Sequence, residues 1–257
     1  MDNWTPFPWT VNPRFDTTHL QRQWSRLHMG DAEPWPERAD VQAAWMLFHN
    51  GEFQRAAMEG LALGDAGMNV ANKATCIYAN YLEPREHARQ QLLLEAATRA
   101  EALQKREPNN AGAWYWQAYA LARYSQCISV AKALTQGLGV KIRQALETTI
   151  ALAPRHADAH LALAGYHAEV IDKVGALVGG MTHGASKDAG LALYQKALAL
   201  NPDSAVTLSE YANGLIMLDG HKRMEEARHL QDRAAAMQPL DAMEQLYVAS
   251  VRLVLEG

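Results

Sequence analysis

The stretch RHADAHLALAGYHAE, residues 155–169, places three histidines on what the spacing predicts to be one helix. His156 and His160 are four residues apart, so on a helix they share a face and could hold one metal ion. His167 lies roughly 10 Å further along the axis, whereas zinc needs its nitrogen ligands about 2 Å from one centre. A site would therefore need His156 with His160 or Asp158 and a third ligand that the sequence does not show. We expect no metal site.

Other fragments with chemistry-bearing residues are isolated. The sequence contains no GxSxG elbow, no phosphate-binding GxxxxGK[ST] loop, no GxGxxG after a strand and no HExxH. Glu226 and His229 form a single ExxH, whereas di-iron helical bundles use two such motifs with two further glutamates. His183 lies in a glycine-rich segment without a visible acid partner. The sequence therefore predicts no catalytic residues and no cofactor; a hydrolase or di-iron oxidase would need a cluster that only the fold could assemble.

The charge of the chain argues against nucleic acid as a partner. The 257 residues carry a formal net charge of −4, and no block of Lys and Arg of the kind that follows phosphates appears. Because the field of the chain is weakly acidic, we expect no nucleic-acid binding.

The sequence predicts a cytoplasmic protein. Cys76 and Cys127 are not part of a CxxC motif, which fits a reducing compartment. The first residues, MDNWTPFPWTVNPRF, lack a charged region followed by an apolar one, and no run approaches the ~18 apolar residues of a membrane span. We expect no membrane association.

Proline recurs regularly in a chain rich in Ala and Leu. Pro108, Pro154, Pro202 and Pro239 are separated by 46, 48 and 37 residues. Each proline follows an amphipathic Ala/Leu segment and precedes a new one, usually after Asn, Asp or Ser, which is typical of one helix ending and another beginning. Recurrence at this period predicts an all-α stack of helix hairpins, without strands.

The repeat details resemble the tetratricopeptide repeat, with its W-x2-L-G-x2-Y first helix and its A-x3-F second helix closed by proline. The matching residues of the last repeat are Leu208, Tyr211, Ala212, Leu215, Ala227, Gln231, Ala234 and Pro239. Trp114, Gln117, Ala118 and Leu121 match in an earlier repeat. The resemblance covers residues 40–255 and implies a right-handed solenoid of antiparallel helix hairpins.

The same alignment assigns two of the three histidines to packing positions. His160 falls in the Trp slot and His167 in the Tyr slot, and both slots face the partner helix. We therefore expect both imidazoles to be flat, partly buried side chains, each with one polar contact.

Two central hairpins are longer than the common repeat. Leu121 to Ile142 spans 21 residues and His167 to Gly190 spans 23, where the common repeat has about nine. This layout is similar to the tetratricopeptide-like domain of regulators of microtubule dynamics and their bacterial relatives; we take the architecture and not the microtubule function. We expect extended first helices, glycine-rich turns, and hairpins that pack on each other through residues including Leu134 and Leu177.

The chain is expected to have three parts. Residues 1–39 form a Trp/Pro-rich capping arm, 40–240 the helical hairpins and 241–257 a C-terminal capping helix. The arm should contain a short helix beginning after Asp16, and its aromatic residues should pack on the first hairpins; these are Trp4, Phe7, Trp9, Phe15, Trp24 and Trp35. The alternative is that the arm is a Trp/Pro motif for a partner.

The predicted function is a non-catalytic scaffold that binds a protein or peptide partner. In a stack of hairpins the first helices line a concave face, which suits extended peptides and partner helices. Tyr115, Tyr119 and Arg123 form one stripe on that face, and aromatic residues and Arg are frequent interface anchors. Glu169, Glu210 and Asn213 continue it on later helices; the stripe could instead be covered by the arm or the hairpins.

Two variants of this hypothesis remain. Exposed apolar residues on the long hairpins or on the last helix could join two copies into a homodimer. The second variant is a helical protein that binds a small ligand or a metal ion between the overlong hairpins, near Cys127, His160, His167 and His183.

Overall fold

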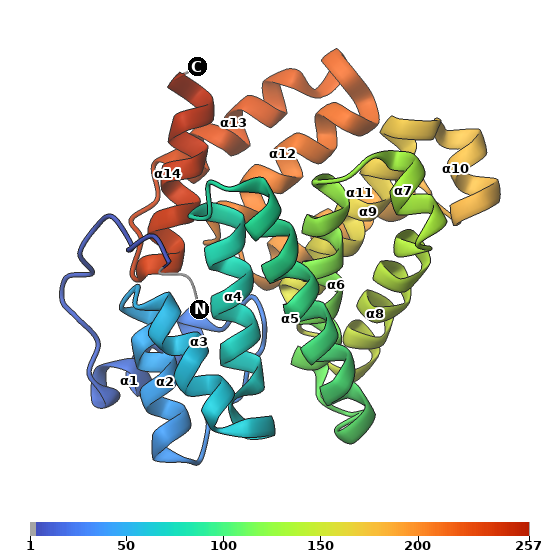
Figure 1. The fold of residues 1–257 in the computed structure, drawn as a ribbon. Coiled ribbons are helices and arrows are strands. Elements are labelled where there is room, and N and C mark those ends of the chain that lie inside the picture. Colours follow the sequence, from blue (N-terminus) through green and yellow to red (C-terminus); the bar gives the residue numbers. More distant parts are fainter. Residues whose placement is uncertain (1–3, 257) are drawn as a thin grey trace. The chain divides into compact units, whose positions relative to one another are not determined.

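The computed structural model describes residues 4–256, and these residues form helices joined by turns, with no strand among them (Figure 1). They divide into two compact units. Unit 1 contains the residues up to His28, Glu33–Leu152 and Leu240–Met243, and unit 2 contains Met29–Ala32, Ala153–Pro239 and the residues from Glu244 onward. This division after Leu152 is a feature that the sequence did not indicate.

Unit 1 is built from helix hairpins in which each helix contacts the next. Its elements are α1 (Thr17–Leu27), α2 (Ala39–His49), α3 (Phe53–Ala62), the 3-10 helix η1 (Gly64–Gly67), α4 (Met68–Tyr81), α5 (Glu86–Arg106), α6 (Ala111–Gln126), α7 (Val130–Thr135) and α8 (Leu138–Leu152). The first helices of its hairpins are α2, α4 and α6, and their partners are α3, α5 and α8.

Unit 2 repeats the arrangement. Its elements are α9 (Ala157–Val174), α10 (Ala176–His183), α11 (Lys187–Leu200), α12 (Ala205–Asp219), η2 (Gly220–Arg223), α13 (Met224–Ala235) and α14 (Ala242–Glu256), whose first two residues are assigned to unit 1. The apolar slots that the sequence assigned to Leu208, Tyr211, Ala212 and Leu215 all lie in its core, with Ala227 and Ala234 of α13 in the same core. Burial of these faces is the main force that holds the hairpins closed.

The helices that precede the four repeat prolines end where the sequence predicted. In each case the helix stops before the proline: α5 before Pro108, α8 before Pro154, α11 before Pro202 and α13 before Pro239. Side-chain oxygens of Asn110, Ser186 and Ser204 accept backbone N–H groups at the starts of α6, α11 and α12. These caps satisfy N–H groups that have no partner within the helix.

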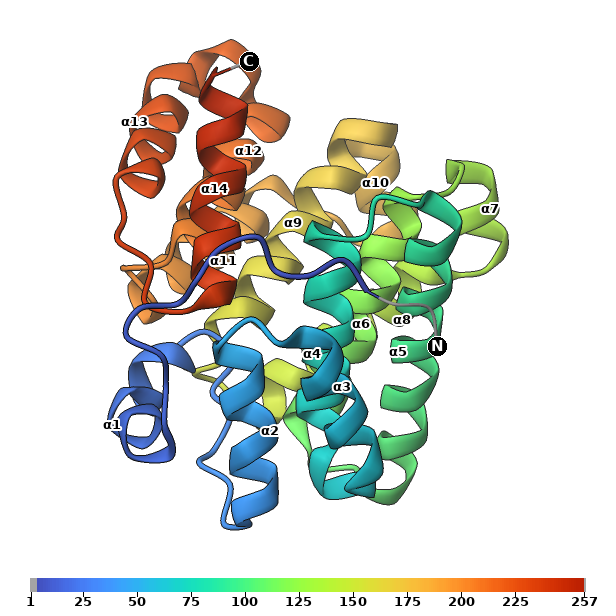
Figure 2. The ribbon, with the colours of Figure 1, turned by 60° about the vertical axis from the view of Figure 1, so that its left-hand side comes forward.

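The arm packs on the first hairpins, as expected. The ring of Trp4 stacks on Tyr78 of α4 with centroids 4.1 Å apart, and Phe7 meets Phe53 of α3 edge-on. Trp9 is an exception, because it is 47% exposed and contacts only the edge of Phe7 among the ring pairs described. Figure 2 shows the arm passing the ends of α3 and α4 before it reaches α1.

The predicted arm helix is confirmed as α1. The Asp16 carboxylate accepts the His19 backbone N–H at 2.7 Å, and Leu20, Trp24 and Leu27 form its buried face. The N-cap and the three-to-four spacing of these residues were sufficient to place this helix.

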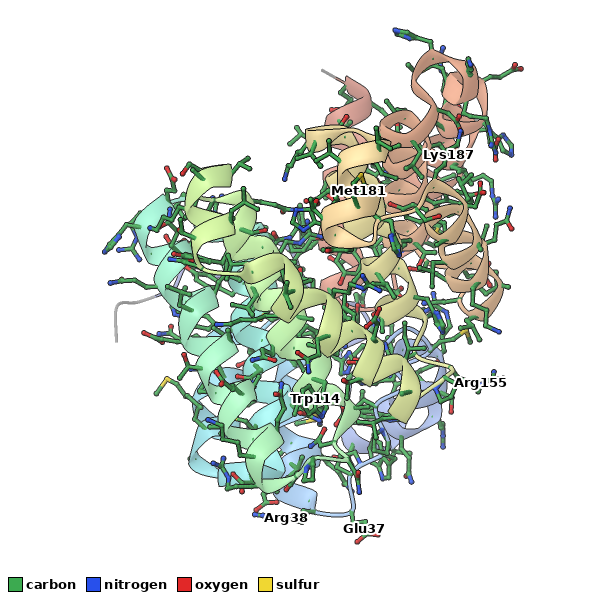
Figure 3. All side chains as sticks on the ribbon, turned by 90° about the vertical axis from the view of Figure 1, so that its right-hand side faces the viewer. Glu37, Arg38, Trp114, Arg155, Met181 and Lys187 are labelled. Atoms are coloured by element: carbon green, nitrogen blue, oxygen red, sulfur yellow. The ribbon has the colours of Figure 1, made fainter. Side chains whose placement is uncertain are left out.

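The overlong hairpins differ from the prediction in how they use their extra residues. The first helices are not extended through the insertion; each insertion folds as a separate short helix, α7 or α10. The expected burial of Leu134 and Leu177 is wrong, because their exposed fractions are 55% and 77%. Met181 of α10, labelled in Figure 3, is 82% exposed. Gly175, with φ of 81°, separates α9 from α10 and supplies the sharp turn.

Candidate functional site

The predicted aromatic stripe on α6 is only partly exposed. Tyr119 and Arg123 are both partly exposed, and the guanidinium of Arg123 lies 5.4 Å from the centre of the Tyr119 ring. Tyr115 is 5% exposed and contacts Trp116 with ring centroids 4.9 Å apart. The expectation that Tyr115 offers a contact surface is therefore corrected: Tyr115 supports the stripe from beneath, and Tyr119 with Arg123 is its reachable part.

A buried lysine lies between the first helices of unit 1. Lys73 of α4 is 2% exposed, and its Nζ lies 5.5 Å from the ring centre of Trp45 and 5.1 Å from that of Phe48, both on α2. Trp116 of α6 is a third ring, at 5.9 Å. Aromatic faces stabilise a desolvated cation. The sequence analysis did not identify this residue, although a lone lysine within the apolar run MNVANKATCIYANY was the available signal.

A buried chain of polar groups lies beside the Trp45 ring. The Nε2 atoms of His28 and His49 are 3.1 Å apart, and His49 Nδ1 lies 2.6 Å from Oδ2 of Asp241. All three residues are at most 3% exposed. Trp24 stacks on His28 and meets Trp45 edge-on. Because His49 and Asp241 are 192 residues apart, no local pattern could have paired them.

These contacts close the first-helix face of unit 1. We call the set Trp45, His49, Lys73 and Trp116 the closed lane, because all four residues are at most 3% exposed. Trp24 of α1 contacts Trp45, and Asp241 contacts His49. Asn69 of α4 is similarly engaged, since its Nδ2 donates to both carboxylate oxygens of Glu33 at 3.1–3.2 Å.

The first helices of unit 2 present a different face. Glu169 of α9, together with Glu210 and Asn213 of α12, is partly exposed, and α9 and α12 contact each other directly. We call these three residues the open lane. Glu169 accepts a hydrogen bond from Lys173 at 3.3 Å, and Asn213 Oδ1 accepts one from Gln231 of α13 at 3.3 Å. The structure therefore brings the three predicted residues of this stretch together on two adjacent helices.

The three histidines of residues 155–169 have structural contacts. His156 caps α9, because its Nδ1 accepts the Ala159 backbone N–H at 3.1 Å. His160 is 7% exposed and Nε2 donates to the Pro154 carbonyl at 3.0 Å; His167 is 6% exposed and Nδ1 accepts the Ser186 N–H at 3.2 Å. The predicted polar contacts are confirmed, and both imidazoles are more deeply buried than the partial burial that we expected.

The other two members of the predicted ligand pocket lie at helix ends. Cys127 follows α6 in unit 1, with its Sγ 3.4 Å from the Arg123 carbonyl, and His183 ends α10 in unit 2, where its carbonyl accepts the Tyr166 hydroxyl at 3.3 Å. Across residues 4–256, no three His, Cys, Asp or Glu side chains are arranged to hold a metal ion. Over the same residues, none of the helices has the length and apolar character that a membrane crossing requires.

Unit 1 also contains a pocket of about 250 Å³ that no sequence pattern predicted. It lies between α3 and α5, and the arm contributes Trp4 to its wall. Glu83, 2% exposed, receives hydrogen bonds from Arg85 Nε and the Tyr78 hydroxyl, both at 2.9 Å. The Arg85 guanidinium is the main reason that the pKa of Glu83 falls from 4.5 to about 2. Glu83 thereby links Tyr78 of α4 to Arg85, the N-cap residue of α5.

Comparisons with known proteins identify the fold. No family model matches the sequence, and no curated protein matches it. Among solved structures, the chain is similar to a thermophilic tetratricopeptide repeat protein of Thermus thermophilus, with a TM-score of 0.57 and 18% sequence identity. The alignment covers 83% of this chain and 97% of that chain. The likeness shows the fold alone: the helix hairpins are tetratricopeptide-like.

Proposed function

We propose that this chain is a non-catalytic scaffold that binds an extended peptide segment of a protein partner on the first helices of its hairpins. Each unit has its own candidate contact residues: Glu169, Glu210 and Asn213 of the open lane in unit 2, and Tyr119 with Arg123 in unit 1. Tetratricopeptide-like folds are typically non-enzymatic, which supports a binding role. First helices of stacked hairpins offer a row of side chains along which an extended peptide can make repeated contacts.

The observation that carries this proposal is the exposure of polar side chains on adjacent first helices. Elsewhere these helices use their inner residues for packing: Trp45 and Lys73 in the closed lane are 1% and 2% exposed. In the open lane, carboxylates and an amide reach the surface from α9 and α12. Removing water from these polar groups costs free energy unless the partner replaces the hydrogen bonds that the water made. The groups therefore favour partners that can form hydrogen bonds with them.

We also infer that the protein works in the cytoplasm and that its partner is another protein or a second copy of this chain. Both cysteines are free thiols, and Cys76 is buried in the core, which fits a reducing compartment. Exposed apolar residues on α14, including Leu253 and Val254 at 72% and 69%, are candidates for pairing two copies.

The test is selection of binders from a random peptide display library on the purified protein. Enriched peptides are synthesised, and their affinities are measured by fluorescence anisotropy for the wild type and three variants. These are Glu210→Ala/Asn213→Ala in the open lane, Tyr119→Ala/Arg123→Ala on α6, and Glu225→Ala/Asp232→Ala as a control on the exposed face of α13.

We expect enriched peptides to bind the wild type and the control alike and to lose at least about tenfold in affinity on a first-helix variant. The unit that loses binding identifies the contact helices. Peptides that bind all three variants equally would show that the site lies elsewhere. If no peptide is enriched above background, the peptide-binding role is wrong.

A further inference from the structure

Tyr194 of α11 places a buried phenol between the two first helices of the open lane. The residue is 1% exposed, and its ring stacks on Tyr211 of α12 with centroids 5.0 Å apart and planes 13° from parallel. Among residues 4–256, the Tyr194 hydroxyl makes no hydrogen bond. A hydroxyl that makes no hydrogen bond within the protein keeps its capacity to donate to and accept from another molecule.

Two glycines make room for the hydroxyl. The end of the Tyr194 ring lies against Gly214 of α12, so closely that a methyl group there would overlap the ring and the oxygen. On the other side, a methyl group on Gly165 of α9 would lie 3.9 Å from the same oxygen. The phenol therefore extends from α11 into a slot whose walls are the glycine positions of α9 and α12.

Both carboxylates of the open lane lie one helical turn from these glycines. Glu169 follows Gly165 by four residues on α9, and Glu210 precedes Gly214 by four residues on α12, so each shares a face with its glycine. A side chain in a helix leans toward the N-terminus, which tilts Glu169 back over Gly165. Burial raises the pKa of Tyr194, and the nearby charges of Glu210 and Glu169 raise it further.

We propose that this slot, formed by Glu169, Glu210 and the Tyr194 hydroxyl, binds the cationic side chain of an arginine or lysine in a partner peptide. The proposal rests on the proposed function and specifies the chemistry of the partner. Carboxylates accept hydrogen bonds only and a phenol oxygen also accepts, whereas ammonium and guanidinium groups donate several. Charge-assisted hydrogen bonds of this kind are short and strong.

The chain already contains one example of the interaction. Lys173, one turn beyond Glu169 on α9, donates to the Glu169 carboxylate at 3.3 Å. Its side chain is 44% exposed, so the pair is a surface contact of the kind that water screens. A peptide cation inserted between Glu169 and Glu210 would meet two carboxylates and the Tyr194 hydroxyl, and would therefore be favoured over this single contact.

The test uses the random peptide library and compares the composition of the enriched pool between protein variants. Glu169→Gln/Glu210→Gln removes both charges and keeps the side-chain size, and Tyr194→Phe removes only the hydroxyl. Glu225→Gln/Asp232→Asn removes the same two charges from the exposed face of α13 and is the matched control. Circular dichroism and thermal unfolding check that each variant is folded.

We expect arginine or lysine at one fixed position of the wild-type pool and of the control pool. A synthetic peptide from that pool should bind Glu169→Gln/Glu210→Gln at least about tenfold more weakly and Tyr194→Phe about two- to tenfold more weakly. Replacing the basic residue of the peptide by citrulline or glutamine should cause a similar loss on the unmodified protein, so the result does not depend on how any variant folds.

The two proposals fail in different ways. A pool that depends on Glu210 and Asn213 but contains no preferred basic residue would overturn the cationic slot and leave the scaffold proposal intact. Equal binding of a basic peptide by the wild type and by Glu169→Gln/Glu210→Gln would also overturn the slot. Absence of any enriched peptide would overturn the scaffold proposal itself.

Discussion

The first helices of unit 1 and those of unit 2 use their side chains in opposite ways. In unit 1, Trp45, Lys73 and Trp116 are large side chains that are at most 3% exposed, and Trp24 contacts the ring of Trp45. In unit 2, the corresponding helices place glycines beside carboxylates, and the face remains partly exposed. The backbone architecture is shared, so the side chains decide whether the face is core or surface.

The difference has a physical cause in the size and polarity of a few residues. Exposing a large aromatic ring to water costs much free energy, because the ring has a large apolar surface. A helix face lined with such rings is therefore buried under other segments of the same chain. Glycine and glutamate can stay exposed to water at little cost in free energy. A repeat protein can therefore convert one part of its inner face into core and retain another part for a partner without changing the helices.

The largest effect is expected from breaking the closed lane at Asp241→Ala. This change leaves His49 buried without its carboxylate, and removal of one member of a buried pair costs about 3–5 kcal/mol. All seven tryptophans lie in unit 1, so tryptophan fluorescence during urea unfolding reports on that unit. Asp232→Ala on the exposed face of α13 is the control, and a loss below about 1 kcal/mol for Asp241→Ala would contradict the assigned role of the pair.

A smaller effect is expected from Gly214→Ala in unit 2. The added methyl group would overlap the Tyr194 ring, and overpacking of a core costs about 1–3 kcal/mol. Because unit 2 contains no tryptophan, the loss should appear in far-ultraviolet circular dichroism and leave the fluorescence transition in place. Gly180→Ala, where the nearest atom to the added methyl group is 3.5 Å away, should be neutral or slightly stabilising. Equal effects of the two changes would contradict the slot geometry.

Acid should affect unit 1 through Glu83. Its pKa is about 2 in the folded chain and 4.5 ordinarily, so the stabilisation is complete above about pH 4.5 and is lost as the pH falls toward 2. Because Arg85 is half-exposed, we expect a loss of about 1–3 kcal/mol over this range. Fluorescence-detected unfolding of the wild type and of Glu83→Gln should differ near neutral pH and converge near pH 2. A constant difference would show that Glu83 does not titrate in this window.

The smallest effect should come from Lys173→Gln in the open lane. Removing this lysine releases Glu169 from its exposed contact, which is worth less than about 1 kcal/mol. Basic peptides selected on the wild type should therefore bind about two- to fivefold more tightly, as measured by anisotropy. Lys196→Gln on α11 removes the same charge from an exposed position and is the control. Weaker binding to Lys173→Gln would mean that this lysine itself contacts the peptide.

Local patterns in the sequence were enough to predict the arm helix and the helices that flank the repeat prolines. Asp16 and the polar residues after the prolines marked helix starts, the prolines marked helix ends, and the apolar spacing at Leu208 and Tyr211 marked the buried side. These signals are local, because a cap acts within one turn and a buried stripe repeats every three to four residues. The burial of His160 and His167 followed from the same alignment.

Which inner faces are closed depends instead on tertiary contacts, and so does the folding of each insertion as a separate short helix. Tyr115 and Tyr119 lie on one predicted stripe, yet Tyr115 is buried and Tyr119 is partly exposed. Likewise, the pairing of His49 with Asp241 joins segments 192 residues apart. The exposure of a residue depends on which distant segments of the chain pack over it. The spacing of residues along one helix contains no information about those segments.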